Sequence, residues 1–213
     1  MKYSFIIWDW NGTIVDDAQL CVDIVNQQLQ NFKLNEVDLE YYLKNFRFPV
    51  SSYYEQIGLP TDYESISEIS SQFIKEYRKL YRSCTIHNGA NSCFEKLRYV
   101  GIHQSILSAS KQTDLLSFIL HFKLEHYFQY ISGVDNVFAS GKSNISHDHL
   151  KKLNTDKSKV LLIGDTLHDA EIAQNLQVDC LLFSGGHNSL EILTESDFPI
   201  VENFGEICNY VLD

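Results

Sequence analysis

Short apolar runs alternate with segments of helical periodicity from about residue 84 to the end of the sequence, and this pattern restricts the fold most strongly. Strands are predicted at 104–108, 130–132, 159–165, 178–183 and 199–201, and helices at 90–100, 111–121, 142–153, 170–176 and 206–211. Such alternation is typical of a parallel sheet whose strands are joined by helical crossovers. The sequence therefore predicts an α/β fold.

One more strand is predicted near the start of the chain, where the apolar run 5–8 reaches Asp9. Asn11-Gly12 follows at once, and both residue types tolerate the positive φ angles of a tight turn. Since ligands bind at the carboxyl ends of the strands in an open parallel sheet, Asp9 would stand at a functional position. Asn-Gly is also a strong hairpin signal, so an aspartate that only caps a turn explains this stretch equally well on its own.

The stretch 16–83 differs from the rest, because it shows helical periodicity and no convincing strand. Helices are predicted from about residue 17 to 29, across 36–57 with a break near Pro49, and from 64 to 81. We therefore expect two domains. Residues 1–15 and 84–213 would form the sheet domain, and residues 16–83 a small helical insertion.

The charge balance excludes some classes of partner. The chain has 213 residues with 17 Lys and Arg against 28 Asp and Glu, which gives a formal net charge of -11. This charge would repel a nucleic-acid backbone and an anionic membrane surface, so we expect neither as a partner. A small phosphorylated molecule remains compatible if a metal ion and a local lysine neutralise it.

Cysteine usage and the N-terminal residues bear on the compartment. The five cysteines are widely spaced and form no CxxC pair, so we expect reduced, structural thiols. No secretory leader pattern opens the sequence, and no apolar run approaches 18 residues. These features favour a cytoplasmic protein.

Two aspartates end two predicted buried strands, Asp9 and Asp165, and they would meet if these strands are neighbours in the sheet. Asp169 follows four residues after Asp165, one turn into the next predicted helix, and would add a third carboxylate. Carboxylate oxygens are the ligands that Mg²⁺ prefers. The competing interpretation is that Asp165 and Thr166 merely cap that helix.

Two further residues have positions that are compatible with phosphate binding. Ser108 ends a predicted strand, where its hydroxyl and the backbone amide of Ala109 would reach a phosphate oxygen, although serines at such ends are often plain caps. Lys142 begins a predicted helix, where the helix dipole disfavours a cation. A charged partner near Lys142 is therefore indicated.

Together, and in this order, these segments resemble the signatures of the haloacid dehalogenase-like hydrolases, in particular of their phosphatases. The first signature, Asp-x-Asp-Gly-Thr, appears as residues 9–13 (Asp-Trp-Asn-Gly-Thr), and the second as the strand that ends at Ser108. The third is a lysine that fits Lys142, and the fourth, Gly-Asp-x-x-x-Asp, stands intact at 164–169. The resemblance spans nearly the whole chain.

The resemblance implies a Rossmann-like core with a helical cap, which would be the insertion at 16–83. It also implies that Asp9 is a nucleophile that forms an aspartyl-phosphate. Mg²⁺ would be held by Asp9, the backbone carbonyl of Asn11, Asp165 and Asp169. Ser108 and Ala109 would bind the phosphoryl oxygens, and Lys142 would neutralise charge on the phosphoryl group and on Asp9.

Asn11 departs from the signature, because the phosphatases of this family usually carry a second aspartate there as general acid and base. An amide can do neither, and losing that function typically costs about 10²- to 10⁴-fold in rate. Two alternatives therefore stay open. One is a hydrolase similar to phosphonoacetaldehyde hydrolase, which would need a cap lysine such as Lys33 or Lys44. The other is a protein of this fold that binds or regulates without efficient turnover.

The substrate is the least determined feature. In the position and size of its cap, the chain resembles phosphoglycolate phosphatase. We expect a monomer or a homodimer. Arg47 is a candidate fork for a substrate carboxylate or second phosphate. Four aromatic residues of the insertion are candidate pocket residues, although aromatics at helical spacing more often belong to the core: Tyr41, Tyr42, Phe46 and Phe48. His168 and His187 are interpreted as incidental.

Overall fold

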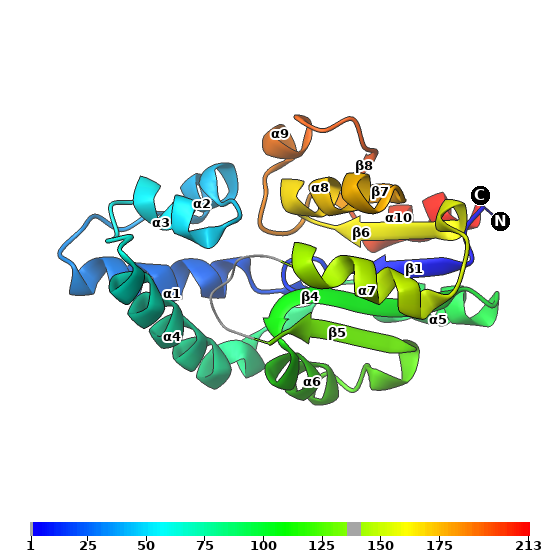
Figure 1. Cartoon of the computed structure of the whole chain (residues 1–213), viewed down its shortest axis with the longest axis horizontal. Helices are drawn as coiled ribbons and strands as arrows, with labels where there is room; N and C mark the ends of the chain where they lie inside the picture. The colour runs from blue at the N-terminus through cyan, green and yellow to red at the C-terminus, as the bar shows by residue number, and fades with distance from the viewer. Residues whose placement is uncertain (1, 136–141) are drawn as a thin grey trace.

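The computed structural model describes residues 2–135 and 142–213, and its centre is a six-stranded sheet in which every neighbouring pair is parallel (Figure 1). The strand order is β5-β4-β1-β6-β7-β8. The bounds are Phe5–Trp8 for β1, His103–Lys111 for β4, Tyr130–Val134 for β5, Val160–Gly164 for β6, Asp179–Phe183 for β7 and Ile200–Val201 for β8. The predicted α/β fold with a Rossmann-like parallel sheet is confirmed.

Strand β1 lies in the middle of the sheet, between β4 and β6. Trp8, its last residue, pairs with Ile106 of β4 and with Ile163 of β6. All four residues of β1 are buried, which explains why the run is apolar without alternation. Because β1 and β6 are neighbours in register, the residues that follow them, Asp9 and Asp165, emerge side by side at the same edge.

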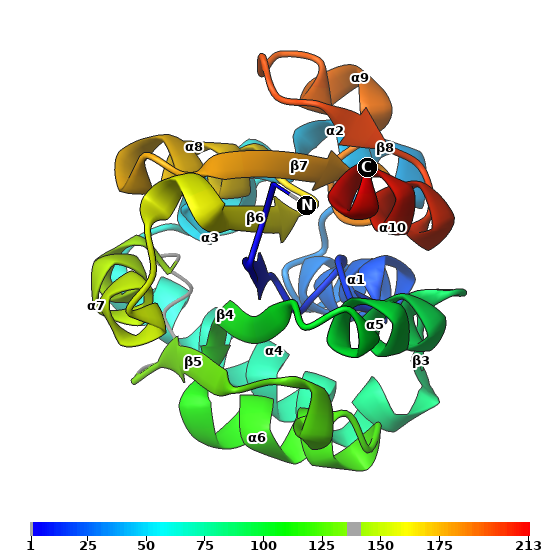
Figure 2. The same ribbon diagram turned by 90° about the vertical axis from the view of Figure 1, so that its right-hand side faces the viewer.

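Helices cover both faces of the sheet (Figure 2). α5 (Ala90–Tyr99) and α10 (Phe204–Leu212) pack on one face, and α7 (Ser143–Leu153) and α8 (Leu167–Leu176) pack on the other. α6 (Gln112–His121) contacts β4 and β5. A short helix, α9 (Leu190–Leu193), precedes β8. Alternate side chains along the strands point to opposite faces of the sheet and belong to two hydrophobic clusters, one on each face.

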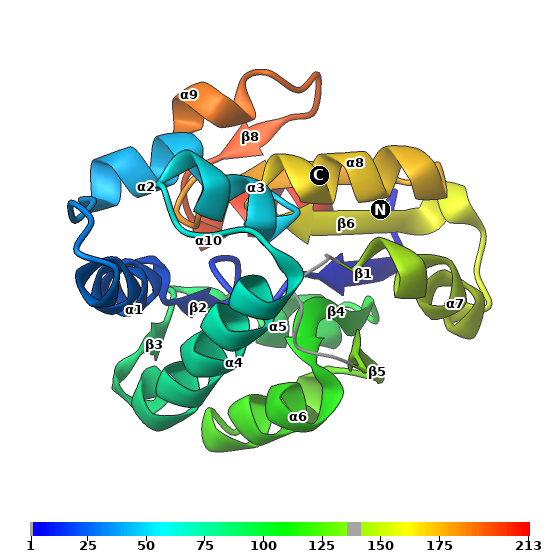
Figure 3. The ribbon, with the colours of Figure 1, turned by 60° about the vertical axis from the view of Figure 1, so that its left-hand side comes forward.

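Four helices lie beyond the carboxyl ends of the strands, in the direction of the strand arrowheads (Figures 1 and 3). They are α1 (Ala18–Asn31), α2 (Leu39–Asn45), α3 (Val50–Gln56) and α4 (Tyr63–Leu80). A two-residue strand β2 (Val15–Asp16) pairs antiparallel with β3 (Thr85–Ile86), so the two passages into and out of this helical segment lie together. The predicted domain boundaries fall at this ribbon, and the division into two domains remains a prediction.

Several details differ from the sequence predictions. The β2–β3 ribbon was not predicted, because two-residue strands carry no periodicity. β4 extends past Ser108 to Lys111, with a shift of register against β5 between Leu107 and Lys111.

The five cysteines are free thiols, as predicted. None of the helices in the described part of the chain has the length and apolar character needed to cross a membrane.

Candidate active site

Lys142 connects two carboxylates at the carboxyl ends of the central strands. Its amine lies 2.5 Å from Oδ1 of Asp9, which follows β1, and 2.7 Å from Oδ1 of Asp169, in the first turn of α8. The side chain of Lys142 is only 3% exposed, so these ion pairs are shielded from water. Lys142 stands at the N-cap position of α7, and its unusual place at a helix start is explained by these two anionic partners.

Asp165 completes a group of three carboxylates. Ligand oxygens of Asp9, Asp165 and Asp169 all lie within 4.8 Å of one another. Asp165 is fully buried and accepts hydrogen bonds from the Thr13 hydroxyl, at 2.5 Å, and from the backbone N–H of His187, at 2.7 Å. Asp169 also accepts from the backbone N–H of Thr166 at 3.0 Å, in a capping box. The helix-capping interpretation is thus true of Thr166 and Asp169 but leaves Asp165 free for the site.

Burial dominates the electrostatics of this cluster. It raises the pKa of Asp9 to about 6 despite Lys142, and the pKa of Asp165 to about 7 despite His187, with mutual repulsion among the carboxylates adding to both shifts. Burial acts in the same direction on Asp169, but Lys142 outweighs it and lowers the pKa of that group. Burial would lower the pKa of Lys142, yet Asp169 and Asp9 raise it above its ordinary value. Lys142 is therefore charged, and the carboxylates carry more negative charge than one lysine offsets.

This donor set fits a divalent metal ion. Three carboxylates supply hard oxygen ligands, which suit Mg²⁺, and a cation would favour the ionised forms of Asp9 and Asp165 that burial now disfavours. Glycines permit the close packing around these groups. A Cβ added at Gly186 would lie 2.2 Å from Oδ2 of Asp165, and one added at Gly164 would lie 2.1 Å from Cγ of Asp169. The backbone carbonyl of Asn11 as a fourth ligand stays a prediction.

A cavity of about 140 Å³ opens beside this cluster. Asp9, Ser108 and Lys142 line it, and Ala109 lies in the same wall, so the structure brings together four of the residues singled out from the sequence. Ser108 is buried, and its Oγ accepts a hydrogen bond from the backbone N–H of Ser110 at 3.0 Å. The opposite wall comes from the segment between α2 and α3, from the first residue of α3, from α4 and from α6.

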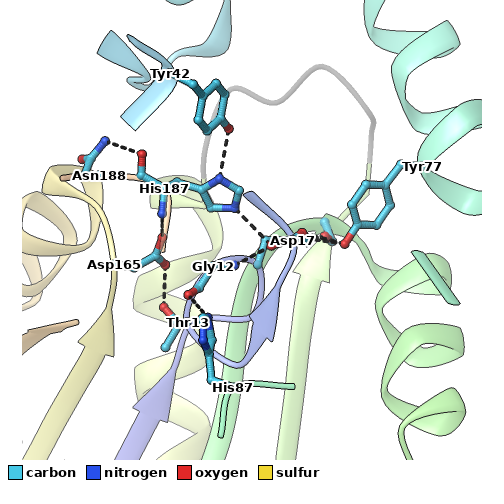
Figure 4. Close-up of polar contacts among 11 residues, drawn as sticks. Gly12, Thr13, Asp17, Tyr42, Tyr77, His87, Asp165, His187 and Asn188 are labelled. Atoms are coloured by element: carbon cyan, nitrogen blue, oxygen red, sulfur yellow. Dashed lines mark hydrogen bonds and ion pairs between the residues drawn. The ribbon is translucent and has the colours of Figure 1, made fainter. Parts of the chain in front are cut away.

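Asp17 is the centre of a second polar network (Figure 4). Its Oδ2 accepts from Nδ2 of Asn11 at 2.6 Å and from the Tyr77 hydroxyl at 2.7 Å, and its Oδ1 accepts from the backbone N–H of Gly12 at 2.8 Å. Asp17 occupies the N-cap position of α1, but its side chain makes no capping hydrogen bond. It instead fixes the turn that follows Asp9. Asn11 is held from its other side by Ser110, whose hydroxyl donates to Oδ1 at 2.8 Å.

His187 links this network to Asp165 and to the helical segment. Its Nε2 lies 3.3 Å from Oδ1 of Asp17, its Nδ1 lies 3.0 Å from the Tyr42 hydroxyl of α2, and its backbone N–H donates to Asp165 (Figure 4). Burial would lower the pKa of His187, but Asp17 and then Asp165 outweigh it and raise the pKa to about 9. His187 is therefore an imidazolium at neutral pH, and the interpretation of this residue as incidental was wrong.

The sequence analysis also missed Tyr77, Thr13 and the role of Asp17. Tyr77 falls on the apolar stripe of α4, where periodicity marks a core position, and its hydroxyl partner lies 60 residues away in the chain. A signal for His187 was present: Gly185-Gly186 follows a predicted buried strand, as Gly12 follows β1. Small residues at such a strand end allow backbone to approach a ligand or a carboxylate closely.

Some candidate residues lie away from the cavity. Arg47 donates to Oε1 of Gln56 at 2.9 Å and to the carbonyl of Asn45 at 3.2 Å, and it lines an adjacent pocket rather than the cavity itself. Tyr41 is exposed, and Tyr42 is buried behind the cavity wall. Phe46 and Phe48 line the cavity, as does His168, whose ring centroid lies 4.8 Å from that of Phe48. The possible Schiff-base lysines Lys33 and Lys44 are not among the lining residues.

Gly12 offers a test of the close packing, with Gly101 as a matched control. Both have positive φ, +73° and +83°, but a Cβ at Gly12 would lie 2.2 Å from Oδ2 of Asp165, whereas one at Gly101 meets nothing within 4 Å. Gly101→Ala is expected to lower the free energy of unfolding by about 1 kcal/mol. Gly12→Ala should lower it by on the order of 2 kcal/mol more. Denaturant unfolding of both variants measures the difference, and equal losses would contradict the packing described.

The ion pair of His187 with Asp17 predicts a pH dependence of stability. The folded-state pKa of His187, about 9, lies above the unfolded value of roughly 6.5, so the stabilisation is complete below pH 6.5 and is lost as pH rises towards 9. The free energy of unfolding should fall by on the order of 1–3 kcal/mol between pH 7 and 9. His187→Gln should flatten this slope, and exposed His147→Gln should leave it unchanged. A slope that survives in His187→Gln would refute the assignment.

Comparison with known proteins adds a family match and fold likeness. The family model described as haloacid dehalogenase-like hydrolase matches residues 6–183. The tyrosine-protein kinase PtkA of Mycobacterium tuberculosis is 20% identical over 212 residues, which cover 96% of this chain and 70% of that protein.

Solved structures of similar fold include two proteins described as a predicted phosphatase from Clostridium acetobutylicum and a predicted phosphoglycolate phosphatase from Haemophilus somnus. The first is 19% identical with a TM-score of 0.84 and covers 100% of this chain and 99% of its own. The second is 16% identical with a TM-score of 0.79, covering 99% and 98%. At these identities the likeness concerns the fold.

Proposed function

Since the chain belongs to the family of haloacid dehalogenase-like hydrolases, we propose that it is a Mg²⁺-dependent phosphatase that hydrolyses a small phosphomonoester through an aspartyl-phosphate on Asp9. The observation that carries this proposal is the buried contact of Lys142 with both Asp9 and Asp169, beside Asp165, at the edge of a cavity. A cation next to a carboxylate nucleophile is what attack on an anionic phosphoryl group requires.

Each residue has a role in this proposal. Asp9 attacks phosphorus with one carboxylate oxygen, and Lys142 offsets negative charge on the transferring group. The hydroxyl of Ser108 and the backbone N–H of Ala109 donate to phosphoryl oxygens. Asp9, Asp165, Asp169 and the Asn11 carbonyl would hold Mg²⁺, which when bound reduces the repulsion between the carboxylates and the phosphoryl group.

The test is release of inorganic phosphate from a panel of small phosphomonoesters, measured with Mg²⁺, with chelator, and after Mg²⁺ is restored. Lys142→Gln should lose at least about 10²-fold in rate. Lys151→Gln serves as the matched control, because Lys151 lies on the same helix, is 77% exposed and pairs only with Asp148 among the described residues. Release that continues unchanged in chelator would contradict the proposal.

The two alternatives give different results in the same assay. A protein that binds without turnover would retain a phosphorylated ligand, seen by calorimetry, and release no phosphate. Phosphonoacetaldehyde hydrolysis would require a lysine of the helical segment that reaches the substrate cavity and forms the Schiff base. Lys44 pairs instead with Glu40 at 2.9 Å, and Lys33 is exposed, so the structure gives this alternative no support.

A further inference from the structure

The wall of the cavity that faces the carboxylate cluster is apolar. Phe46 and Phe48, between α2 and α3, and Val50, the first residue of α3, form part of it. Phe73 of α4 and Phe118 of α6 form the rest. In a phosphatase the phosphoryl group occupies the polar side near Asp9, so this wall would contact the leaving group. Side chains of this kind bind flat apolar groups well and stabilise ionic groups poorly.

The cavity has the size of one aromatic ring. Its volume of about 140 Å³ is close to that of an apolar cavity of about 150 Å³ that holds benzene in another protein. His168 belongs to the same wall and lies against Phe48, and its Nε2 is buried with no hydrogen-bond partner in the described residues. Beside the phosphoryl group, the cavity therefore admits at most one ring.

Cations that would recognise a second acidic group are engaged elsewhere. Arg47 is bound to Gln56 in the adjacent pocket, and Arg78 forms two hydrogen bonds with Asp114, at 2.9 and 2.8 Å. Lys111 lines the cavity, but it belongs to the β4 end that carries Ser108. Residues 136–141 contain no Lys, Arg or His. A substrate carboxylate directed at the helical segment would therefore lie against aromatic rings, and Lys111, on the strand side of the cavity, is the lining cation that remains for it.

Asn11 independently limits the leaving group. Its amide cannot give a proton, and the hydroxyl of Ser110 donates to Asn11 itself. Tyr77 and His187 direct their protons to Asp17 and Tyr42. A leaving oxygen must then depart as an anion or take its proton from water. A phenol, which ionises near pH 10, can do so far more readily than an aliphatic alcohol.

We propose that the substrate is an aryl phosphomonoester whose single apolar ring occupies this cavity, an inference that rests on the function proposed above. One oxygen of Asp9 forms a bond to phosphorus while the bond from phosphorus to the phenolic oxygen breaks. The electron pair stays on that oxygen, which is then protonated by water. Hydrolysis of the aspartyl-phosphate by a second water returns Asp9 and releases inorganic phosphate.

Four substrates separate the contributions of ring and leaving group: phenyl phosphate, benzyl phosphate, 2-phosphoglycolate and acetyl phosphate. Benzyl phosphate has the ring but an alkoxide leaving group, and acetyl phosphate has a good leaving group but no ring. The expected kcat/KM for phenyl phosphate exceeds those for benzyl phosphate and phosphoglycolate at least about tenfold. Phosphoglycolate as the better substrate would overturn the inference, and its loss in Lys111→Met would then assign Lys111 as the carboxylate partner.

Because phenyl phosphate is intrinsically reactive, the ring pocket is tested by variants. Phe73→Ala should lower the ratio of kcat/KM for phenyl phosphate to that for acetyl phosphate about tenfold. Phe32→Ala, at a 45% exposed phenylalanine outside the cavity, should leave the ratio unchanged. If the ratio is unchanged in Phe73→Ala while acetyl phosphate is still hydrolysed, the inference about the ring is overturned and the proposed function is not. Absence of metal-dependent release from all four substrates would overturn the proposed function as well.

Discussion

Replacing Asp9 with Asn is expected to reduce phosphate release by at least about 10³-fold, the largest effect of any single substitution in this site. The amide supplies neither a nucleophilic oxygen nor the negative charge that faces Lys142 at 2.5 Å. Steady-state release from the best substrate of the panel measures the loss. A variant that keeps a tenth of the natural rate would exclude Asp9 as nucleophile.

The same substitution should leave the fold intact, which separates a chemical effect from unfolding. Asp9 is a buried carboxylate whose pKa is raised to about 6, so the ionised group is held at a cost in solvation. A neutral amide removes that cost along with part of the attraction to Lys142, which keeps Asp169 as a partner. Thermal unfolding of Asp9→Asn checks this, with the exposed Asp148→Asn as the matched substitution elsewhere.

Exchanging the carboxylate and the amide between positions 11 and 17 is expected to produce the largest gain. In the natural protein Nδ2 of Asn11 donates to Oδ2 of Asp17 at 2.6 Å. The double variant Asn11→Asp with Asp17→Asn keeps this hydrogen bond in the reverse direction and moves the carboxyl group to the residue that lines the cavity. It also removes the carboxylate that pairs with His187, so thermal unfolding of the double variant is measured beside its activity. A general acid and base there typically contributes about 10²- to 10⁴-fold. We expect a gain in this range for benzyl phosphate and a smaller one for phenyl phosphate.

The single variant Asn11→Asp is the informative control for the exchange. It would place two buried carboxylates within hydrogen-bond distance, and one of them must bind a proton. Because the folded pKa of that carboxyl lies above its unfolded value, stability relative to the natural protein should fall as pH rises from 5 to 8. Equal gains in the single and double variants, with no such pH dependence, would show that Asp17 does not control position 11.

Sequence patterns predicted the sheet and its site because both depend on local order along the chain. Strand β1 and strand β6 are buried apolar runs that each end on an aspartate, and their neighbouring positions bring Asp9 and Asp165 together. The order of Ser108, Lys142 and Asp169 along the alternating strands and helices was enough to expect them at one edge. The family match confirms the resemblance that these segments carry.

Residues that act through distant partners could not be predicted in this way. His187 contacts Asp17 and Tyr42, which lie 170 and 145 positions away in the chain, so no local pattern marks it. Arg47 looked like a substrate fork because its residue type suits anions, but its guanidinium bonds to Gln56 on the neighbouring helix. Residue type predicts what a side chain can bind, whereas its direction depends on tertiary packing.

Hydrogen bonds between the sheet domain and the helical segment also explain what holds the apolar wall of the cavity in place. Tyr42 of α2 and Tyr77 of α4 both hydrogen-bond to the buried pair of His187 and Asp17 (Figure 4). Nδ2 of Asn188 donates to the Phe46 carbonyl at 2.9 Å. Because His187 and Gly12 also contact Asp165 and Asp17 through their backbone N–H groups, one network positions both Asp165 and the wall that faces it.

The most direct test of the central claim is to trap the phosphorylated enzyme. The protein is mixed with phenyl phosphate and Mg²⁺, quenched in acid within the first turnover, digested and examined by mass spectrometry. We predict one added phosphoryl group, labile to hydroxylamine, on the peptide that contains Asp9, and none in Asp9→Asn. Phosphate release without any phosphorylated Asp9 peptide, or with the group on another residue, would contradict the claim that Asp9 is the nucleophile.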